Sequence, residues 1–465
     1  MQGRSTAVEA QANVAPNVAA APPNSTYAFM ISAVAACAGL LFGYDIAVIN
    51  GALLLLQREF TLSPTQTEWA ASSLLAGCVI GAATGGWLSD RWGRKYILIA
   101  CALLFAISSL AAALPRNVTE FALARVLGGV AIGVSSLLAP LYIAEIAPAA
   151  QRGRLVSLQQ LAIVSGILLA YFINWILSFQ GADAWRGMFA AAALPSLIFF
   201  LAMLTAPESP RWLVQRNRRD DALRVLVRVN GQEQGAAELC EIERMVAEES
   251  GTLSELWKPG LRRALVLGLA LAILQQWTGI NTVLFYGSIL LKQYTGGTSD
   301  TAAIGANVWI GVVNLVATLV AMAVIDRWGR RKLLISSAAG LGLGLLAMAA
   351  AFAGGAPNAA LVVPLMLCCA GAFAVGLGPG VWVYLSEIFP NRIRGRAMGL
   401  ATTALWAACC VLTFTFLSIA NRVGASGAFL LYALLCGVTI AVVLKAPETR
   451  NRSLEQIESL WRPHQ

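Results

Sequence analysis

Three short polar sequences occur twice in this chain and divide it into two halves. The first half carries Asp90-Arg-Trp-Gly-Arg, Glu145-Ile-x-Pro and Pro207-Glu208, and the second half carries their copies at Asp326, Glu387 and Pro447. Each copy comes about 240 residues after the original, and each lies in a short polar gap between long apolar runs. Duplicated junctions of this kind predict two equivalent bundles of helices that share a central interface.

The apolar runs between these junctions are long enough to cross a lipid bilayer. Hydrophobic residues make up 58% of the 465 residues, and charged residues make up only 12%, about half of what soluble globular domains carry. Hydrocarbon excludes charge, and a helix of about 20 apolar residues spans it. Twelve such runs are predicted, at 27–55, 67–89, 96–114, 119–142, 155–178, 186–206, 264–291, 302–325, 333–353, 361–386, 396–420 and 426–445. We therefore expect an all-α integral membrane protein with twelve transmembrane helices in two pseudo-symmetric six-helix bundles.

The basic residues predict the orientation of the chain and its division into segments. With the amino terminus inside, the lysines and arginines that fall outside the cytoplasm are few: Arg58, Arg116, Arg186, Lys292 and Arg422, with Arg125 inside a span. Positive charge retained on the cytoplasmic side is typical of polytopic membrane proteins, so the net charge of +9 does not indicate nucleic acid. We expect a multi-pass protein of the cell membrane with both termini cytoplasmic. Its predicted segments are a disordered tail (1–26), a bundle (27–206), a cytoplasmic linker of amphipathic helices (207–263), a second bundle (264–445) and a cytoplasmic tail (446–465).

Cysteine and histidine chemistry has little support in this sequence. Most of the nine cysteines lie in apolar spans, none has paired metal-ligand spacing, and the single histidine is His464. No combination of nucleophile, base and orienting group is apparent in any span. We therefore expect neither an enzyme nor a metal or organic cofactor.

Two ionisable residues stand well inside predicted spans, Asp45 in the first and Arg125 in the fourth. A charge in mid-membrane costs about 2.5–3.5 kcal/mol on insertion scales, so such residues persist where they face a cavity or each other. Both fall in the outer half of the bilayer, which allows them to pair. An aspartate whose contact with Arg125 changed with conformation would bind and release a proton, which predicts proton coupling; the alternative is a static structural ion pair.

The duplicated junctions predict a charged gate on the cytoplasmic side. In each half the glycine of Asp-Arg-Trp-Gly-Arg permits a tight turn, and its arginines can reach the carboxylate at the end of a neighbouring span, Glu145 or Glu387. The predicted intracellular gate comprises Asp90, Arg91, Arg94, Glu145, Arg152, Glu208, Arg211, Asp326, Arg327, Arg330, Arg331, Glu387 and Arg394. The alternative is that these basic residues serve only to anchor the membrane topology.

Uncharged amides and two tryptophans also stand in apolar surroundings. They are Gln160, Gln275, Gln276, Asn281, Asn314, Trp382 and Trp406. An amide both donates and accepts hydrogen bonds, and an indole offers a flat apolar face with one N–H. A single amide could simply bond between helices, a contact worth about 0.6 kcal/mol. Five amides with two inward tryptophans favour a neutral polyhydroxyl ligand.

The chain resembles the sugar porter family of the major facilitator superfamily over essentially residues 27–460. Seven motifs carry the resemblance, in order Phe42-Gly-Tyr-Asp45, Asp90-Arg-x-Gly-Arg, Pro140-x-Tyr-x-x-Glu145, Pro207-Glu-Ser-Pro-Arg-Trp-Leu213, Gln275-Gln-x-x-Gly-Ile-Asn281, Gly378-Pro-x-x-Trp382 and Pro447-Glu-Thr449. The resemblance implies sugar contacts at the amides and tryptophans above, and a cavity lined or gated by the aromatics Phe42, Phe285 and Tyr286. It also implies that Asp45 binds the coupled proton and that Arg125 modulates it.

Three positions depart from the pattern of this family. Leu405 replaces a polar amide found in many relatives, Ile167 replaces a glutamine of a xylose symporter, and Ala192 replaces an acid of that symporter. They leave the identity of the sugar open.

The predicted function is import of a monosaccharide by proton symport through alternating access, in a monomer whose partners are the sugar, protons and the lipid bilayer. The first alternative is a facilitative, uncoupled sugar or polyol uniporter of the same fold. A sugar sensor that binds without transporting is a third hypothesis.

Overall fold

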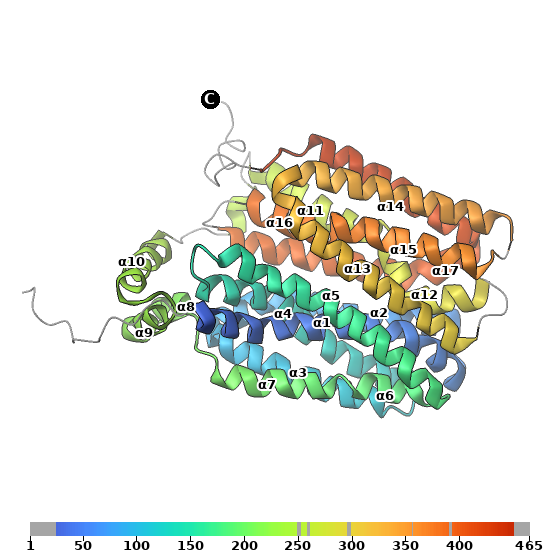
Figure 1. Ribbon diagram of the computed structural model, residues 1–465, viewed down its shortest axis with the longest axis horizontal. Helices are drawn as coiled ribbons and strands as arrows, with labels where there is room; N and C mark the ends of the chain where they lie inside the picture. Colours follow the sequence, from blue (N-terminus) through green and yellow to red (C-terminus); the bar gives the residue numbers. More distant parts are fainter. Residues whose placement is uncertain are drawn as a thin grey trace, which may run out of the picture.

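The computed structural model describes residues 25–248, 253–257, 261–294, 299–355, 357–389 and 393–450, and within them helices run side by side along one axis (Figure 1). The first half of the chain holds α1 (Ser25–Glu59), α2 (Pro64–Trp92), α3 (Arg94–Ala113), α4 (Val118–Ile146), α5 (Arg152–Leu177), α6 (Ala184–Ala190) and α7 (Ala193–Thr205). The second half holds α11 (Leu261–Trp277), α12 (Ile280–Tyr294), α13 (Asp300–Trp328), α14 (Arg330–Ala353), α15 (Ala359–Val375), α16 (Leu377–Ile388) and α17 (Arg394–Lys445). In Figure 1 the two halves lie against each other, blue to green below and yellow to red above. Most of the predicted tails, 1–26 and 446–465, lies outside the described residues.

The number of spans agrees with the predicted fold class. Within the described ranges, eleven helical segments are long and apolar enough to cross a membrane. The longest, α17, has 52 residues and contains Gly424 in a non-helical conformation (φ 77°, ψ 161°), so it holds two of the predicted spans. The described chain therefore accommodates twelve crossings, as the sequence predicts.

Three of the predicted spans are broken, which the apolar pattern did not reveal. The run 186–206 is divided between α6 and α7, 264–291 between α11 and α12, and 361–386 between α15 and α16. In the second of these, Gly279 adopts φ 83°, a left-handed conformation that glycine accepts without strain. In the third, the side-chain amide of Gln275 donates to the carbonyls of Leu377 (2.7 Å) and Gly378 (3.3 Å). The backbone N–H of Leu377, which has no intrahelical acceptor at the start of α16, donates to the Ser337 hydroxyl (2.9 Å). Backbone groups freed at a break within the membrane need such partners, because hydrocarbon offers none.

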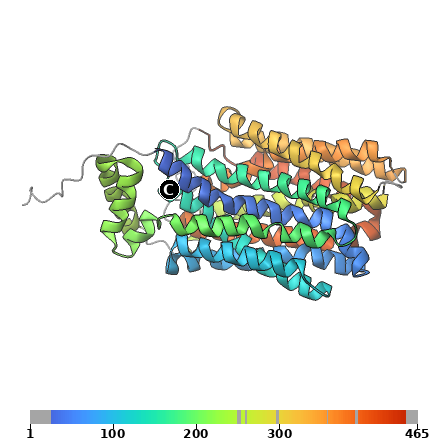
Figure 2. The same cartoon turned by 60° about the horizontal axis from the view of Figure 1, so that its bottom comes forward.

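Three short helices connect the halves: α8 (Pro210–Gln215), α9 (Arg219–Asn230) and α10 (Gln232–Glu248). They have a small apolar core of their own, made by Trp212, Leu213, Ala222, Leu226, Leu239 and Ile242. Helices α9 and α10 stand beyond one end of the bundles in both views (Figures 1 and 2). The indole N–H of Trp212 donates to the carbonyl of Asp90 (3.1 Å), which fixes the start of the linker to the end of α2.

Replacing Gly279 with alanine should destabilise the protein. The substitution forces a residue with a Cβ into the left-handed region, at about 1–2 kcal/mol, and the new methyl would lie 2.5 Å from the ring of Tyr432. Thermal unfolding of the purified protein in detergent should show a lower midpoint. Gly437→Ala is the matched control, because nothing lies within 4 Å of its Cβ position and alanine favours the helix. Equal midpoints for the two variants would contradict this account of the break.

Candidate functional site

A cavity of about 120 Å³ lies between the two halves. It is lined from both sides by Phe42 and Ile46 of α1, Gln160, Ile163, Val164 and Ile167 of α5, Gln275 and Gln276 of α11, Asn281 and Leu284 of α12, Asn314 and Thr318 of α13, Phe373, Ala374, Gly378, Pro379 and Trp382 of α15 and α16, and Leu405, Trp406 and Cys409 of α17. All seven predicted sugar-contact residues line this one cavity. Two of the three broken helices meet at its wall.

The amides on the second-half side of the cavity form a chain of hydrogen bonds. Asn281 donates to the side-chain oxygen of Gln276 (2.6 Å), and Gln276 donates to that of Gln275 (3.0 Å). Gln275 in turn donates to the carbonyl of Leu377, where α16 begins. These bonds hold three amides in fixed orientations at the break between α11 and α12, which preorganises donors and acceptors toward the cavity.

Two further amides carry no hydrogen bond within the described residues, Gln160 on α5 and Asn314 on α13. They belong to opposite halves and both line the cavity. The hydroxyl of Thr318, one turn from Asn314, is also buried without a hydrogen-bond partner among the described residues. Sequence reasoning missed Thr318, because a threonine in an apolar run usually bonds to its own helix. A ligand with several hydroxyls could satisfy all three groups at once.

The remaining wall of the cavity is apolar and aromatic. The rings of Phe42 and Trp406 lie 5.4 Å apart across the two halves, and the indole N–H of Trp406 donates to the hydroxyl of Ser136 (3.4 Å). Ile167 and Leu405, two of the positions that depart from the family pattern, both line the cavity. At these two positions the cavity offers methyl groups where an amide would offer hydrogen bonds.

Two of the three predicted cavity aromatics do not line the cavity. Phe285 and Tyr286 are fully buried, and the Tyr286 hydroxyl donates to the carbonyl of Thr413 within its own half (2.7 Å). The ring of Tyr286 packs on Phe416 at 5.1 Å. The reason is helical geometry, because Leu284 takes the position on α12 that faces the cavity and the next two residues point elsewhere.

At the end of the cavity away from the linker helices α9 and α10, called the outer side here, hydrogen bonds join the two halves. Asn50 of α1 donates to the carbonyl of Leu284 (2.8 Å) and accepts from the hydroxyl of Ser288 (2.6 Å). Its amide also donates to Asn307 of α13 (3.1 Å), and the Tyr171 hydroxyl donates to the carbonyl of Leu284 (3.1 Å). Nothing in the sequence pattern singled out Asn50, because its role comes from a helix far away in the sequence.

Asp45 and Arg125 form the predicted pair inside the first half. Arg125 donates to the carboxylate of Asp45 (3.1 Å) and to its backbone carbonyl (2.6 Å). Asp45 is 3% exposed and Arg125 is 1% exposed, and the guanidinium lies 5.1 Å from the centre of the Phe189 ring. Asp45 does not line the cavity, although Phe42 and Ile46 of the same helix do. A protonation change at Asp45 therefore has no direct contact with the cavity, but α1, which carries Asp45, lines it.

The duplicated junctions form equivalent charged clusters, one in each half. In the first, the Arg94 side chain contacts Glu145 (3.3 Å) and Asp90 (3.2 Å), while Glu208 accepts from the backbone N–H groups of Arg94 (2.9 Å) and Lys95 (3.1 Å). Burial raises the pKa of the Glu208 carboxyl, although these N–H groups oppose the shift. Arg94 thus reaches Glu145, as the sequence predicts, whereas Arg91 of the same motif forms no ion pair with Glu145 within the described residues.

In the second half, Arg330 pairs with Glu387 (2.9 Å), and Glu448 accepts from the backbone N–H groups of Arg330 (3.2 Å) and Arg331 (3.1 Å). Tyrosines repeat as well: Tyr142 donates to the carbonyl of Pro207 (2.5 Å) and Tyr384 donates to that of Pro447 (2.9 Å). The duplication therefore extends to the hydrogen bonds.

Other predicted gate residues lie around these clusters. Arg152 does not join Glu145; it pairs with Glu238 of α10 (3.2 Å), because the linker folds back over the start of α5. The guanidinium of Arg91 lies over Trp87 and Trp92 at 5.7 and 5.6 Å, and that of Arg394 donates to the carbonyl of Phe389 (3.4 Å). Arg327 is exposed and Arg211 is half-buried. The side chain of Asp326 lies outside what the structure describes.

Removing Glu145 should cost more stability than removing Glu387. The Arg94 and Glu145 side chains are 4% and 6% exposed, whereas those of Arg330 and Glu387 are 14% and 21% exposed. Loss of one partner from a buried pair leaves an uncompensated charge and costs about 3–5 kcal/mol, and the cost falls as water reaches the site. Thermal unfolding of Glu145→Ala and Glu387→Ala in detergent measures the difference. Equal losses of stability in the two variants would show that burial does not determine how much each ion pair contributes.

Comparison with known proteins gives a consistent set of relatives. A family model described as "Sugar (and other) transporter" matches residues 31–461. The arabinose-proton symporter of Bacillus subtilis (strain 168) is 39% identical over 457 residues, which cover 96% of this chain and 98% of that protein. The D-xylose-proton symporter of Escherichia coli (strain K12) is 37% identical over 480 residues, which cover 95% of this chain and 97% of that protein.

Solved structures show the same fold. A partially occluded, inward-open conformation of the xylose transporter XylE from E. coli has a TM-score of 0.83 at 34% identity and covers 92% of this chain and 100% of that one. The proton:xylose symporter XylE of the major facilitator superfamily, bound to 6-bromo-6-deoxy-D-glucose, has a TM-score of 0.81 at 35% identity. The match covers 94% of this chain and 100% of that one. These likenesses confirm the predicted fold class.

Proposed function

The chain belongs to the sugar transporter family, and on that premise we propose that it imports a monosaccharide together with a proton by alternating access. The relatives described above include proteins named as arabinose- and xylose-proton symporters. The names favour the symport prediction over the uncoupled uniporter. They leave open which sugar this chain carries.

The observation that carries the proposal is the position of Asp45 on α1. One helix supplies Phe42 and Ile46 to the cavity, Asp45 to the pair with Arg125, and Asn50 to the outer closure. A proton on Asp45 would cancel the charge that holds Arg125, and α1 could then shift against α4. Because the same helix lines the cavity and closes its outer side, that shift would change access to the bound sugar.

The cavity supports a neutral sugar as the ligand. Gln160 and Asn314 lie on opposite halves with amides that carry no hydrogen bond within the described residues, and Trp382 and Trp406 supply apolar faces. A sugar that bonds to both halves would draw them together around itself, which suits a carrier that alternates between two closures.

We also propose the setting in which transport occurs. The protein would be a monomer in the cell membrane with both termini cytoplasmic, since the linker and the arginine clusters lie at one end of the bundles and basic residues stay on the cytoplasmic side. It would need no cofactor other than the transported proton and would bind no nucleic acid. The segments 27–206 and 264–445 would be the two moving bundles.

Replacing Asp45 with asparagine should uncouple sugar movement from the proton gradient. Asparagine keeps the size and can still accept a hydrogen bond from Arg125, but it cannot bind and release a proton. In proteoliposomes, the native protein should accumulate labelled sugar when the outside is acidified, and Asp45→Asn should not. The variant should retain counterflow exchange of labelled for unlabelled sugar, since exchange needs no net proton movement.

The matched control is Asp183→Asn, the same substitution at an exposed loop position, which should accumulate sugar as the native protein does. Gradient-driven accumulation by Asp45→Asn would remove the coupling role of Asp45. Accumulation by the native protein that ignored the gradient would leave a passive carrier.

Replacing Gln160 or Asn314 with alanine should weaken sugar binding without uncoupling it. Each change removes about one neutral hydrogen bond to the sugar, worth about 0.5–1.5 kcal/mol, so the half-saturating sugar concentration should rise about 2–10-fold. Uptake at graded sugar concentrations measures the half-saturating concentration, and Gln232→Ala, at an exposed position, is the control. An unchanged half-saturating concentration in both variants would place the sugar elsewhere.

A panel of unlabelled pentoses, hexoses and inositols competing with the labelled sugar identifies the substrate.

A further inference from the structure

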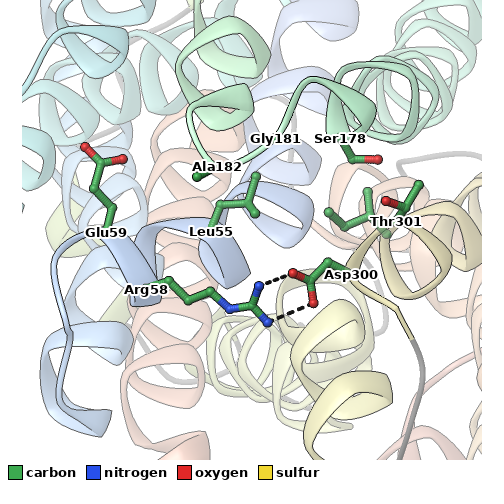
Figure 3. A pocket seen from close by; sticks show the side chains of 9 residues that line it. Leu55, Arg58, Glu59, Ser178, Gly181, Ala182, Asp300 and Thr301 are labelled. Atoms are coloured by element: carbon green, nitrogen blue, oxygen red, sulfur yellow. Dashed lines mark hydrogen bonds and ion pairs between the residues drawn. The ribbon is translucent and has the colours of Figure 1, made fainter.

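The outer ends of the two halves are joined by an ion pair that water can reach. Arg58 of α1 pairs with Asp300 of α13, beside a pocket of about 220 Å³ on the outer side (Figure 3). Lys292 also contacts Asp300 (3.1 Å). The Arg58 side chain is 56% exposed, and exposed pairs of this kind change an equilibrium by no more than about fivefold.

The same pocket offers little to a ligand. Arg58 and Asp300 already hold each other, and Glu59, the third charged residue of the lining, pairs with Arg186 (2.6 Å). No charge of the pocket lining is therefore left unpaired within the described residues. Within that part of the chain the pocket therefore offers no free charge to a ligand, and its exposed ion pair can add only little to the closure formed by the Asn50 hydrogen bonds.

A buried carboxylate joins the halves through a different pair of helices, α2 and α17. Glu68 lies in the first turns of α2 and is 1% exposed. One of its oxygens accepts from the backbone N–H of Ser418 (2.6 Å), and the other accepts from the Ser418 hydroxyl (2.6 Å). Ser418 belongs to α17, in the other half. No lysine or arginine forms an ion pair with Glu68 within the described residues, so these two donors are the main compensation for its charge.

Glu68 stands in a continuous contact between α2 and α17. Its neighbour Trp69 meets Phe414 edge to face at 6.5 Å. One turn further in, the thiol of Cys410 approaches the carbonyl of Ser72 (3.8 Å), and the Ser72 hydroxyl donates to the carbonyl of Glu68 (2.7 Å). These contacts place the buried Glu68 carboxylate within the interface of α2 and α17. In such surroundings hydrogen bonds to a charged group are stronger than neutral ones.

We propose that the bonds from Ser418 to Glu68 form a latch that holds the outer side of the transporter closed. The proposal rests on alternating access, because the outer ends must part for a sugar to enter from outside. Opening would replace both bonds with water, and bonds to a charged group favour the closed form by about 10- to 100-fold. The buried latch then outweighs the exposed pair of Arg58 and Asp300 in setting which side the resting protein opens to.

Hydrogen exchange of the complete protein in lipid nanodiscs, read by mass spectrometry without sugar, tests the latch. Glu68→Ala should raise exchange at the outer helix ends 50–59, 280–292 and 412–420, and lower it at the inner ends 86–95 and 393–400, because the halves rock. Glu68→Gln, which keeps neutral hydrogen bonds, should shift less. Ser418→Ala keeps the backbone N–H and should also shift less than Glu68→Ala.

The control is Asp300→Asn, which weakens the exposed pair and should change exchange at both ends by much less. Opposite shifts at the two ends in Glu68→Gln and Ser418→Ala support the latch even where Glu68→Ala folds poorly. Unchanged exchange in both, or increased exchange at both ends, overturns it and leaves Glu68 a purely structural residue. Uptake by the native protein tests transport separately, so failure of the latch and failure of the proposed function give different results.

Discussion

Every polar backbone group in this protein must find a partner inside the protein wherever hydrocarbon replaces water. That constraint explains the long helices, and it also explains where they can stop. The breaks between α11 and α12 and between α15 and α16 occur at the cavity, where the Gln275 amide meets the carbonyls at the start of α16. The irregular backbone and the candidate sugar site therefore adjoin, since the Gln275 amide that bonds to the backbone at the start of α16 also lines the cavity.

Helix α1 connects the three parts of the proposed mechanism. Successive turns contribute to the cavity, to the pair with Arg125 and to the outer closure at Asn50. Because a helix is stiff over such a length, a change at any of the three is felt by the other two. The buried pair of Asp45 and Arg125 in the first half has no matching charged pair at the corresponding place in the described part of the second half. The two bundles therefore differ in function: the first carries the candidate proton site, and the second carries most of the amides that line the cavity.

The duplication preserved the polar junctions at one end of the bundles more closely than the interior. Glu208 and Glu448 both accept hydrogen bonds from backbone N–H groups at the tight turns. Tyr142 and Tyr384 each donate to the carbonyl of the proline that precedes the glutamate, Pro207 and Pro447. The pair of Arg94 and Glu145 is more buried than that of Arg330 and Glu387, and Ser209, at the start of the linker, donates its hydroxyl to Glu145 (2.5 Å). Arg152 shows the same influence, since its partner comes from the linker.

The sequence by itself determined the membrane-spanning class, the number of crossings and the two halves, and it showed that Asp45 and Arg125 could pair, because these follow from the length of apolar runs, the spacing of repeated motifs and the cost of isolated charge in hydrocarbon. It also indicated the amides and tryptophans of the cavity, partly through resemblance to a family. Only the tertiary structure decided that Phe285 and Tyr286 turn away from the cavity, that Arg152 binds the linker, that Asn50 and Glu68 bond across the two halves, and that Thr318 lines the cavity. Each of these depends on which face of a helix meets a part of the chain far away in the sequence, and the length of an apolar run does not specify that face.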